Sequence, residues 1–284
     1  MPNYRELGNE HFKAGRFKEA EQQYTDSILT VSRNDPKVFT NRSLARIRLQ
    51  DWAGAESDAR KAIELYGDKN TITMKSCYYL AQALLAQRRV GEALTEATRA
   101  YSICLETKDS SAEVISQFIL RAKQVQWQTK ETLRLREMNN TLAMVETMLD
   151  ERLQQELKEL KERLQHGEIG VTGLNEEKAE LEKEADERRR NIRAAFSNPV
   201  EPDSVERVVP DYLIDAITFQ IMHDPVITPS GNSYERVSLL KHLRSHGTDP
   251  LTRLPLSEKQ IYPNMALRNA CSEFLESNGW AVDW

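Results

Sequence analysis

The chain has 284 residues, of which 29% are charged, and its formal net charge is −5 at pH 7. This length suits two small domains and a linker, and the acidic balance provides no basic field that would favour nucleic acid as a ligand. Three cysteines, no apolar run of about 18 residues and no apolar N-terminal segment predict no membrane partner and a reducing compartment, the cytoplasm first and the nucleus second.

An internal repeat occupies the N-terminal third of the chain. Ala20, Ala55 and Ala93 stand 35 and 38 residues apart, and a larger apolar residue precedes each of them by three positions. Small residues recur twelve positions before and seven positions after each alanine, as expected where two helices cross closely. The residues at the three offsets are Phe17, Trp52 and Val90, then Gly8, Ser43 and Ala81, then Ser27, Ala62 and Ala100.

This spacing resembles the tetratricopeptide repeat, a helix–turn–helix unit of about 34 residues. Stacked repeats need about three copies to bury a continuous core, and three are present. A longer loop is expected at Tyr66–Thr73, where Gly67 and Asn70 favour irregular backbone. A further helix over about 112–128 is expected to cap the stack. The side chains expected to face the stack from it are Ile115, Phe118, Ile119, Ala122 and Trp127.

Basic and amide side chains are placed to converge on the concave face of such a stack. Arg5 and Asn9 are four residues apart on the first helix, so they share a face. Asn41 and Arg48 stand seven apart on the inner helix of the second repeat, and Lys75 begins that of the third. Such groups suit an acidic, extended peptide with a terminal carboxylate. The alternative is that they are ordinary solvated helix residues.

The five positions are similar to the carboxylate clamp of chaperone-binding tetratricopeptide domains. The resemblance implies that the groove binds the acidic C-terminal tails of heat-shock chaperones of the seventy- and ninety-kilodalton classes. The chain departs from that family at two positions. Arg5 stands where the family usually has lysine, and Tyr79 stands where it often has arginine, so one charged contact is absent.

A highly charged segment, 129–206, follows the repeats. Its leucines follow steps of seven, four, four, three and four residues, an amphipathic stripe of the coiled-coil type. Three glycines within 166–173 predict a helix break, and a second helix over 174–196 has a thin apolar side. We expect an antiparallel hairpin that pairs with a second copy of the chain, the alternative being a monomeric rigid spacer. The apolar residues are Leu142, Leu149, Leu153, Leu157, Leu160 and Leu164, then Leu181, Ala185 and Ile192.

The C-terminal segment, 207–284, has the pattern of a small α+β domain. Asp224-Pro225 precedes a short β-like run, and the turn-forming residues 229–232 predict a hairpin. Apolar spacing predicts helices over 237–243 and 266–275, and prolines at 250 and 255 predict an irregular loop between them. The side chains expected to anchor the loops are Asp224, Ser230, Tyr234, Glu235, Arg236, Asp249 and Arg253.

Metal and nucleophile chemistry are not expected in this segment. A zinc domain of this size needs thiolate ligands in paired short spacings, and the segment has the single cysteine Cys271. His223, His242 and His246 lack the cysteine or carboxylate partners of a metal site. Cys271 falls on the apolar side of a predicted helix, where a cysteine behaves as a small hydrophobic residue rather than a catalytic group.

The order of these parts resembles the U-box, the metal-free relative of the RING domain. The resemblance implies a ubiquitin ligase without a nucleophile or cofactor of its own, which holds a charged conjugating enzyme in a reactive pose. It also implies that Ile217 and Phe219 of the first loop and Pro250 and Arg253 of the second form the docking surface. The alternative for Ile217 and Phe219 is ordinary core packing.

We therefore expect a mostly α chain with a tetratricopeptide solenoid at 1–128, a dimerising helical hairpin at 129–206 and a small α+β U-box at 207–284. The expected function is a homodimeric co-chaperone ubiquitin ligase. Its expected partners are the two chaperone classes, a conjugating enzyme and misfolded client proteins. Two alternatives remain, a chaperone adaptor without transfer activity and a U-box scaffold in a nuclear assembly.

Overall fold

The computed structural model describes residues 3–30, 34–67, 70–196 and 208–284. The expected boundary at 206/207 and part of the expected loop Tyr66–Thr73 lie outside these residues. Contacts divide the chain into two compact units, the first formed by 1–128 with 209–284 and the second by 129–208. Among the described residues, no helix is long and apolar enough to cross a membrane.

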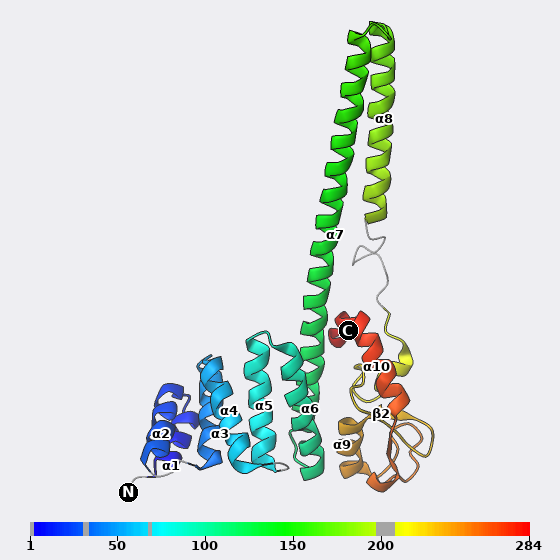
Figure 1. Cartoon of the computed structure of the whole chain (residues 1–284). Helices are drawn as coiled ribbons and strands as arrows, with labels where there is room; N and C mark the ends of the chain where they lie inside the picture. Colours follow the sequence, from blue (N-terminus) through cyan, green and yellow to red (C-terminus); the bar gives the residue numbers. More distant parts are fainter. Residues whose placement is uncertain (1–2, 31–33, 68–69, 197–207) are drawn as a thin grey trace. The chain divides into compact units, whose positions relative to one another are not determined.

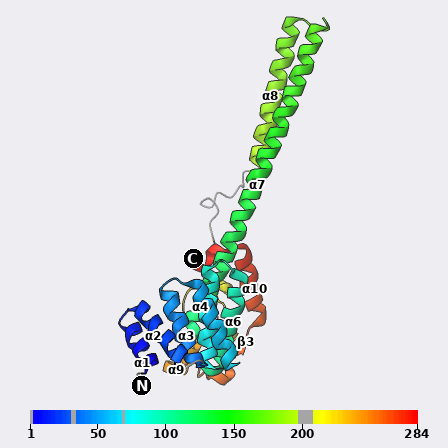
Figure 2. The same cartoon turned by 60° about the vertical axis from the view of Figure 1, so that its left-hand side comes forward.

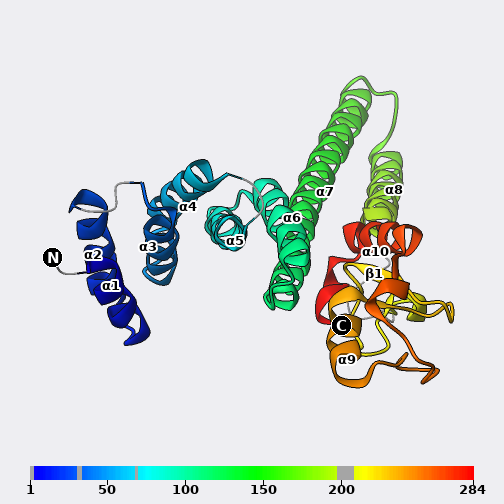
Figure 3. The same cartoon turned by 90° about the horizontal axis from the view of Figure 1, so that it is seen from below.

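The predicted repeats form three helical pairs in sequence order (Figure 1). Neighbouring helices pack side by side, and the first helices of the pairs also contact one another, so they line one face of the stack (Figure 3). The pairs are α1 (Tyr4–Lys13) with α2 (Phe17–Thr30), α3 (Pro36–Arg48) with α4 (Trp52–Tyr66), and α5 (Thr71–Ala86) with α6 (Val90–Thr107).

The small residues of the repeat lie where the helices cross. Ala20, Ala55 and Ala93 are fully buried, and so are the small residues at the two other offsets. A residue of this size lets two helix backbones approach closely, and the larger apolar residues fill the space beside it. The sequence repeat is therefore a packing repeat, and the predicted tetratricopeptide architecture is confirmed.

The same backbone conformation recurs at the end of the first helix of each pair, although the residue types there differ. Gly15, Gln50 and Arg88 follow the first helix of each pair, with φ of 75°, 62° and 62°. At each of these turns the next residue donates its N–H to the carbonyl five positions earlier, the pattern of a Schellman helix end. Only the first repeat has the glycine that this conformation favours.

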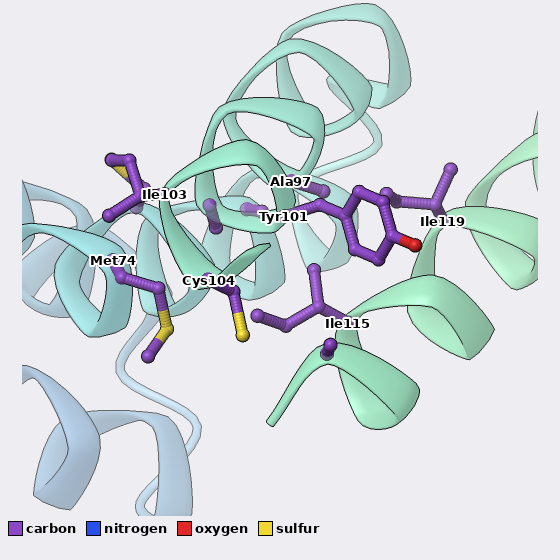
Figure 4. Packing of buried hydrophobic residues seen from close by; sticks show 11 residues of the cluster. Met74, Ala97, Tyr101, Ile103, Cys104, Ile115 and Ile119 are labelled. Carbon is purple, nitrogen blue, oxygen red and sulfur yellow. The ribbon is translucent and has the colours of Figure 1, made fainter. Parts of the chain in front are cut away.

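The third repeat and the start of α7 (Ala112–Gln165) share the largest core cluster (Figure 4). Ile115 and Ile119 of α7 are buried against Tyr101 and Cys104 of α6, so the predicted cap is present. Trp127, expected to face the repeats, was wrongly placed. Its Nε1 donates to the carbonyl oxygen of Ser277 in the C-terminal domain, at 3.1 Å.

The cap and the first hairpin helix, expected as separate helices, are one continuous helix of 54 residues, α7. Its sequence contains no glycine or proline that would end it. The helix breaks at Gly167 and Gly170, whereas the third predicted glycine, Gly173, lies inside α8 (Val171–Phe196). This helix returns antiparallel to α7 (Figure 2). Leu160 and Ala185 are buried between the two helices, and Arg163 pairs with Glu177 at 2.7 Å.

The C-terminal domain surrounds a small antiparallel sheet of order β2-β1-β3. The predicted hairpin is confirmed, since Val226 pairs with Tyr234, and the two predicted helices are present as α9 and α10. The third strand was not predicted. The elements are η1 (Asp211–Leu213), β1 (Pro225–Ile227), β2 (Ser233–Glu235), α9 (Arg236–His246), η2 (Glu258–Gln260), β3 (Tyr262–Pro263), α10 (Met265–Ser277) and η3 (Gly279–Asp283).

A buried aspartate joins the C-terminal domain to the repeats. Asp224 pairs with Arg236 at 2.6 Å and with Arg268, and it accepts a hydrogen bond from the Tyr101 hydroxyl of α6 at 3.2 Å. Burial alone would raise the pKa of Asp224, but the two guanidinium groups outweigh burial and hold the pKa below its ordinary value. The carboxylate therefore remains charged inside the unit.

Two further contacts fix α7 against the C-terminal domain. The ammonium group of Lys123 donates to the Ser272 hydroxyl at 3.1 Å. At Gly279, a Cβ atom would lie 2.5 Å from the Cβ of Trp127, so only glycine permits this close approach. The repeats and the C-terminal domain thus share a packed interface rather than a flexible link.

We predict that Asp58→Ala unfolds the repeats at markedly lower denaturant concentration. Asp58 is 3% exposed and pairs with Arg42 at 2.7 Å and Arg46 at 2.9 Å. Removing one member of a buried ion pair leaves uncompensated charge, so we expect a loss of about 3 kcal/mol in the free energy of unfolding. Glu64→Ala, which removes the exposed pair with Lys61, serves as the control and should cost less than about 1 kcal/mol. Equal denaturation midpoints for the two variants would contradict this.

Candidate functional site

Four of the five predicted clamp residues meet in one groove. The groove has a volume of about 340 Å³ and lies between α1, α3 and α5. Each helix contributes side chains from the face that it turns toward the other two, as the four-residue spacing of Arg5 and Asn9 predicts. The lining residues are Arg5, Asn9, Lys37, Thr40, Asn41, Ile72 and Lys75.

Arg48 is the predicted clamp residue that does not line this groove. It is the last residue of α3 and lies two turns beyond Asn41, which is about 10 Å along the helix axis. Its charge acts instead on Tyr78 and Tyr79 of α5, where it opposes the increase in pKa that burial causes. The seven-residue spacing places Asn41 and Arg48 on the same face of α3, but it does not place them in the same groove.

Lys37 and Thr40 line the groove and were missed. Lys37 precedes Asn41 by four residues, so the helical spacing used for Arg5 and Asn9 would have identified it. Thr40 had no such signal, because its hydroxyl is buried and lies 2.8 Å from that of Ser76. With Lys37, three cationic side chains surround two amides in the groove.

The first loop of the C-terminal domain is closed by Asp215. The Asp215 N–H donates to the carbonyl oxygen of Gln220, and the Phe219 N–H donates to that of Asp215, both at 2.8 Å. The Asp215 carboxylate, fully buried, accepts from the backbone N–H and the hydroxyl of Thr218. It also accepts from the Glu235 N–H of β2 at 3.0 Å, which ties the loop to the sheet.

The second loop is closed in the same way by Asp249. The Asp249 N–H donates to the carbonyl oxygen of Leu254, and the Arg253 N–H donates to that of Asp249, both at 2.9 Å. The carboxylate accepts from the Ser230 hydroxyl at 2.6 Å and from the Tyr234 hydroxyl at 2.9 Å. Burial would raise the pKa of Asp249, but these hydrogen bonds outweigh it and hold the pKa well below its ordinary value.

The two loops therefore present matching positions. Phe219 and Arg253 each follow the closing aspartate by four residues and have left-handed backbone, with φ of 57° and 59°. The aspartates are tied to Tyr234 and Glu235, which are neighbours on β2. Of the predicted anchors, Arg253 contributes its backbone and leaves its side chain exposed.

The predicted docking residues lie on these loops with different exposures. Phe219 is 73% exposed, which is unusual for so large an apolar side chain, and the Arg253 side chain is exposed. Pro250 is half-buried. Ile217 is also half-buried, and its buried part packs against the core beneath the hairpin. The alternative of core packing therefore applies to Ile217 in part.

Two exposed leucines beside these residues were missed. Leu251 and Leu254 of the second loop are 61% and 60% exposed. The prolines at 250 and 255 keep this segment irregular, so its apolar side chains have no helix or strand face on which to be buried. Exposed apolar residues on two adjacent loops form a surface suited to a protein partner.

Cys271 has the buried environment that its position in the sequence predicted. Its side chain is 1% exposed, and burial raises the pKa of the thiol to about 11. A nucleophilic cysteine requires an accessible thiolate. Cys271 is therefore a core residue of the domain and not a nucleophile.

Comparisons with known proteins agree with this geometry. The U-box domain family matches residues 209–280. The E3 ubiquitin-protein ligase CHIP of Arabidopsis thaliana is 32% identical over 280 residues, 98% of this chain and 94% of the relative. Ubiquitin conjugation factor E4 of Schizosaccharomyces pombe is 44% identical over 70 residues, 24% of this chain and 7% of the relative. The complex of the TPR2B domain of yeast Sti1 with pHsp70 aligns with 43% of this chain and 94% of that chain, at 29% identity and a TM-score of 0.39.

Tetratricopeptide repeats joined to a U-box define the architecture of one class of ubiquitin ligase. Its chemistry is that of a transferase without a covalent nucleophile of its own. The chain belongs to the CHIP family of E3 ubiquitin-protein ligases, to which it is similar over nearly its whole length. The predicted function, a ubiquitin ligase of the co-chaperone type, is confirmed at the level of this family.

We predict that Glu235→Gln changes how stability depends on pH. Burial raises the pKa of the Glu235 carboxyl to about 7, from an ordinary 4.5. Between these values the folded state retains a proton that the unfolded state has lost, so this group makes the parent less stable as pH rises. The glutamine is neutral throughout, and the stability of the variant relative to the parent should therefore increase across this window.

The measurement is the urea midpoint of both proteins at about pH 5 and about pH 8. Burial also lowers the pKa of His223, to about 4, which acts in the opposite direction. Because His223 is present in both proteins, its contribution cancels in the difference. The same difference at both pH values would contradict the raised carboxyl pKa.

Proposed function

We propose that the repeats bind the acidic C-terminal tails of heat-shock chaperones, and that the U-box directs ubiquitin to the chaperone or its misfolded client. One observation carries the proposal: Arg5, Asn9, Asn41 and Lys75 line a single groove in a chain that ends in a U-box. We also propose the cytoplasm and, as a second location, the nucleus, because three free cysteines suit a reducing compartment.

The groove has the chemistry that a peptide carboxylate requires. Amide N–H groups and ammonium groups are donors, and a carboxylate accepts charge-assisted hydrogen bonds from both. Arg5 pairs with Asp35 at 3.6 Å, and both side chains are about one-third exposed. A pair this exposed stabilises the protein little, so an incoming carboxylate replaces Asp35 at low cost.

Lys75→Ala should weaken binding of a chaperone-tail peptide about tenfold or more, because it removes one charge-assisted hydrogen bond, worth about 1.5 to 3 kcal/mol. Isothermal titration calorimetry with a peptide ending in a free carboxylate measures this. Lys61→Ala is the control, since Lys61 lies on α4, outside the groove, and pairs with Glu64. Equal affinities of the parent and the Lys75 variant would exclude the clamp.

We further propose that a ubiquitin-conjugating enzyme docks on Ile217, Phe219 and Pro250. The exposed apolar side chains of both loops support this, because each would be removed from water on docking. Arg253 stands beside them with five guanidinium donors and a loop backbone fixed by Asp249. A hydrogen bond from Arg253 to ubiquitin and its carrier would favour the attack-ready conformer, which is catalysis through orientation.

Phe219→Ala should reduce ubiquitin discharge about tenfold or more while leaving the fold intact, because the ring is an exposed hot-spot candidate outside the core. A reconstituted autoubiquitination assay measures the rate. Met265→Ala provides the control, since Met265 is 54% exposed and lies outside the two loops. An unchanged rate in the Phe219 variant would reject docking at this residue.

Two other functions give different outcomes in the same assays. A chaperone adaptor binds the tail peptide but forms no ubiquitin product with any conjugating enzyme tested. A U-box scaffold of a nuclear assembly does not bind the tail peptide. The convergence of the groove residues argues against the scaffold, and similarity to an E3 ubiquitin-protein ligase over nearly the whole chain argues against the adaptor.

We also propose that the hairpin of α7 and α8 pairs with a second copy of the chain. Met144 and Met148 stand four residues apart on one face of α7 and are 60% and 53% exposed. Exposed methionines at helical spacing suit a helix–helix interface because the side chain adapts its shape to a partner. The monomeric spacer is the alternative.

Replacing Met144 and Met148 together by lysine should convert a dimer to a monomer, because two charges would be buried without partners at the interface. Light scattering after size-exclusion chromatography gives the mass. Asn139→Lys adds a charge at an exposed position on the opposite side of α7 and should leave the dimer intact. A monomeric parent would favour the spacer, and a dimeric double variant would place the interface elsewhere.

A further inference from the structure

Asn9 can help to hold a carboxylate only in one of its two amide orientations. Its NH₂ group attracts the ligand and its carbonyl oxygen repels it, and rotation by 180° exchanges the two. The side chain is half-buried at the edge of the groove. Whatever fixes this rotation therefore decides whether Asn9 assists or opposes the three cationic side chains of the groove in holding a carboxylate.

Two donors converge on the Asn9 oxygen. The Tyr24 hydroxyl of α2 donates to Oδ1 of Asn9 at 2.8 Å, and Nδ2 of Asn41 donates to the same oxygen at 2.9 Å. Both lone pairs of the oxygen are thereby used, which leaves the NH₂ group of Asn9 for the groove. Tyr24 approaches from behind the groove and does not line it.

Tyr24 is built to remain a donor. Its side chain is 1% exposed, and burial raises the pKa of its hydroxyl to about 12, so the proton remains in place at neutral pH. Gly8 makes room for the ring, because a Cβ atom there would lie 2.5 Å from a Tyr24 ring carbon. The first repeat therefore places this hydroxyl by close packing of α1 on α2.

We propose that Tyr24 is a positioning residue of the clamp, which fixes the Asn9 amide so that its NH₂ group faces the ligand carboxylate. The inference rests on the proposed tail-binding function. Without the Tyr24 hydroxyl, one of two donors is lost and the flipped amide becomes populated. The clamp then prefers a free terminal carboxylate less strongly, while the repeats remain folded.

The test compares two peptides, an acidic tail ending in a free carboxylate and the same peptide ending in a carboxamide. The ratio of their affinities measures carboxylate recognition. Tyr24→Phe should lower this ratio about threefold or more, which is the size expected from one neutral hydrogen bond. Tyr66→Phe, an exposed tyrosine of α4, should keep the parental ratio.

Each outcome separates the two proposals. If the parent prefers the carboxylate and Tyr24→Phe keeps that preference, or weakens both peptides equally, the positioning role is overturned while the clamp stands. If the parent has no preference, the clamp itself fails, and the positioning role fails with it.

A second measurement needs no variant. In the NMR spectrum of the parent, the side-chain amide protons of Asn9 should shift on addition of the carboxylate peptide and much less on addition of the carboxamide. Equal shifts with both peptides would overturn the positioning role even if Tyr24→Phe did not fold.

Discussion

Hydrogen bonding to two buried aspartates, Asp215 and Asp249, determines the shape of the C-terminal domain. Each carboxylate satisfies loop N–H groups that have no strand or helix partner, and each is tied to an adjacent residue of β2. Hydrogen bonds to charged groups contribute about 1.5 to 3 kcal/mol each, enough for several of them to fix a loop without a metal ion. The two carboxylates fix the loops, and the exposed Phe219 and Arg253 are held in them by their N–H groups, which donate to the backbone carbonyl oxygens of the same aspartates.

The groove of the repeats is built on a different principle. Regular helices carry its side chains, so the position of each follows from the helix period and from the small residues that set the distance between helices. The two candidate sites therefore tolerate change differently. A loop site fails when one carboxylate is lost, whereas a helical groove loses its contacts one at a time.

Sequence reasoning succeeded where periodicity carried the information. The alanine repeat gave the helical pairs, and four of the five predicted clamp residues line the groove. It failed where tertiary contact decides: Trp127 contacts the C-terminal domain instead of the repeats, and Arg48 shares a face with Asn41 but not a site. The turns at Gln50 and Arg88 carry no glycine, so their left-handed backbone has no signal in the residue type. The matching geometry of the two loops did leave a signal in the sequence, which was missed. Asp215 and Asp249 are each followed by an aliphatic residue two positions later and by a threonine three positions later, and each threonine N–H donates to the aspartate carboxylate.

Phe219 and Arg253 both have left-handed backbone, a conformation that lowers the stability of the domain when the residue is not glycine. A side chain in this conformation costs about 1 kcal/mol that glycine would not. Mutation toward glycine would therefore make the domain more heat-resistant while removing the two exposed side chains through which we propose that it binds a partner. The stability of the domain explains neither large side chain, because each has an unfavourable backbone conformation and lies exposed outside the core.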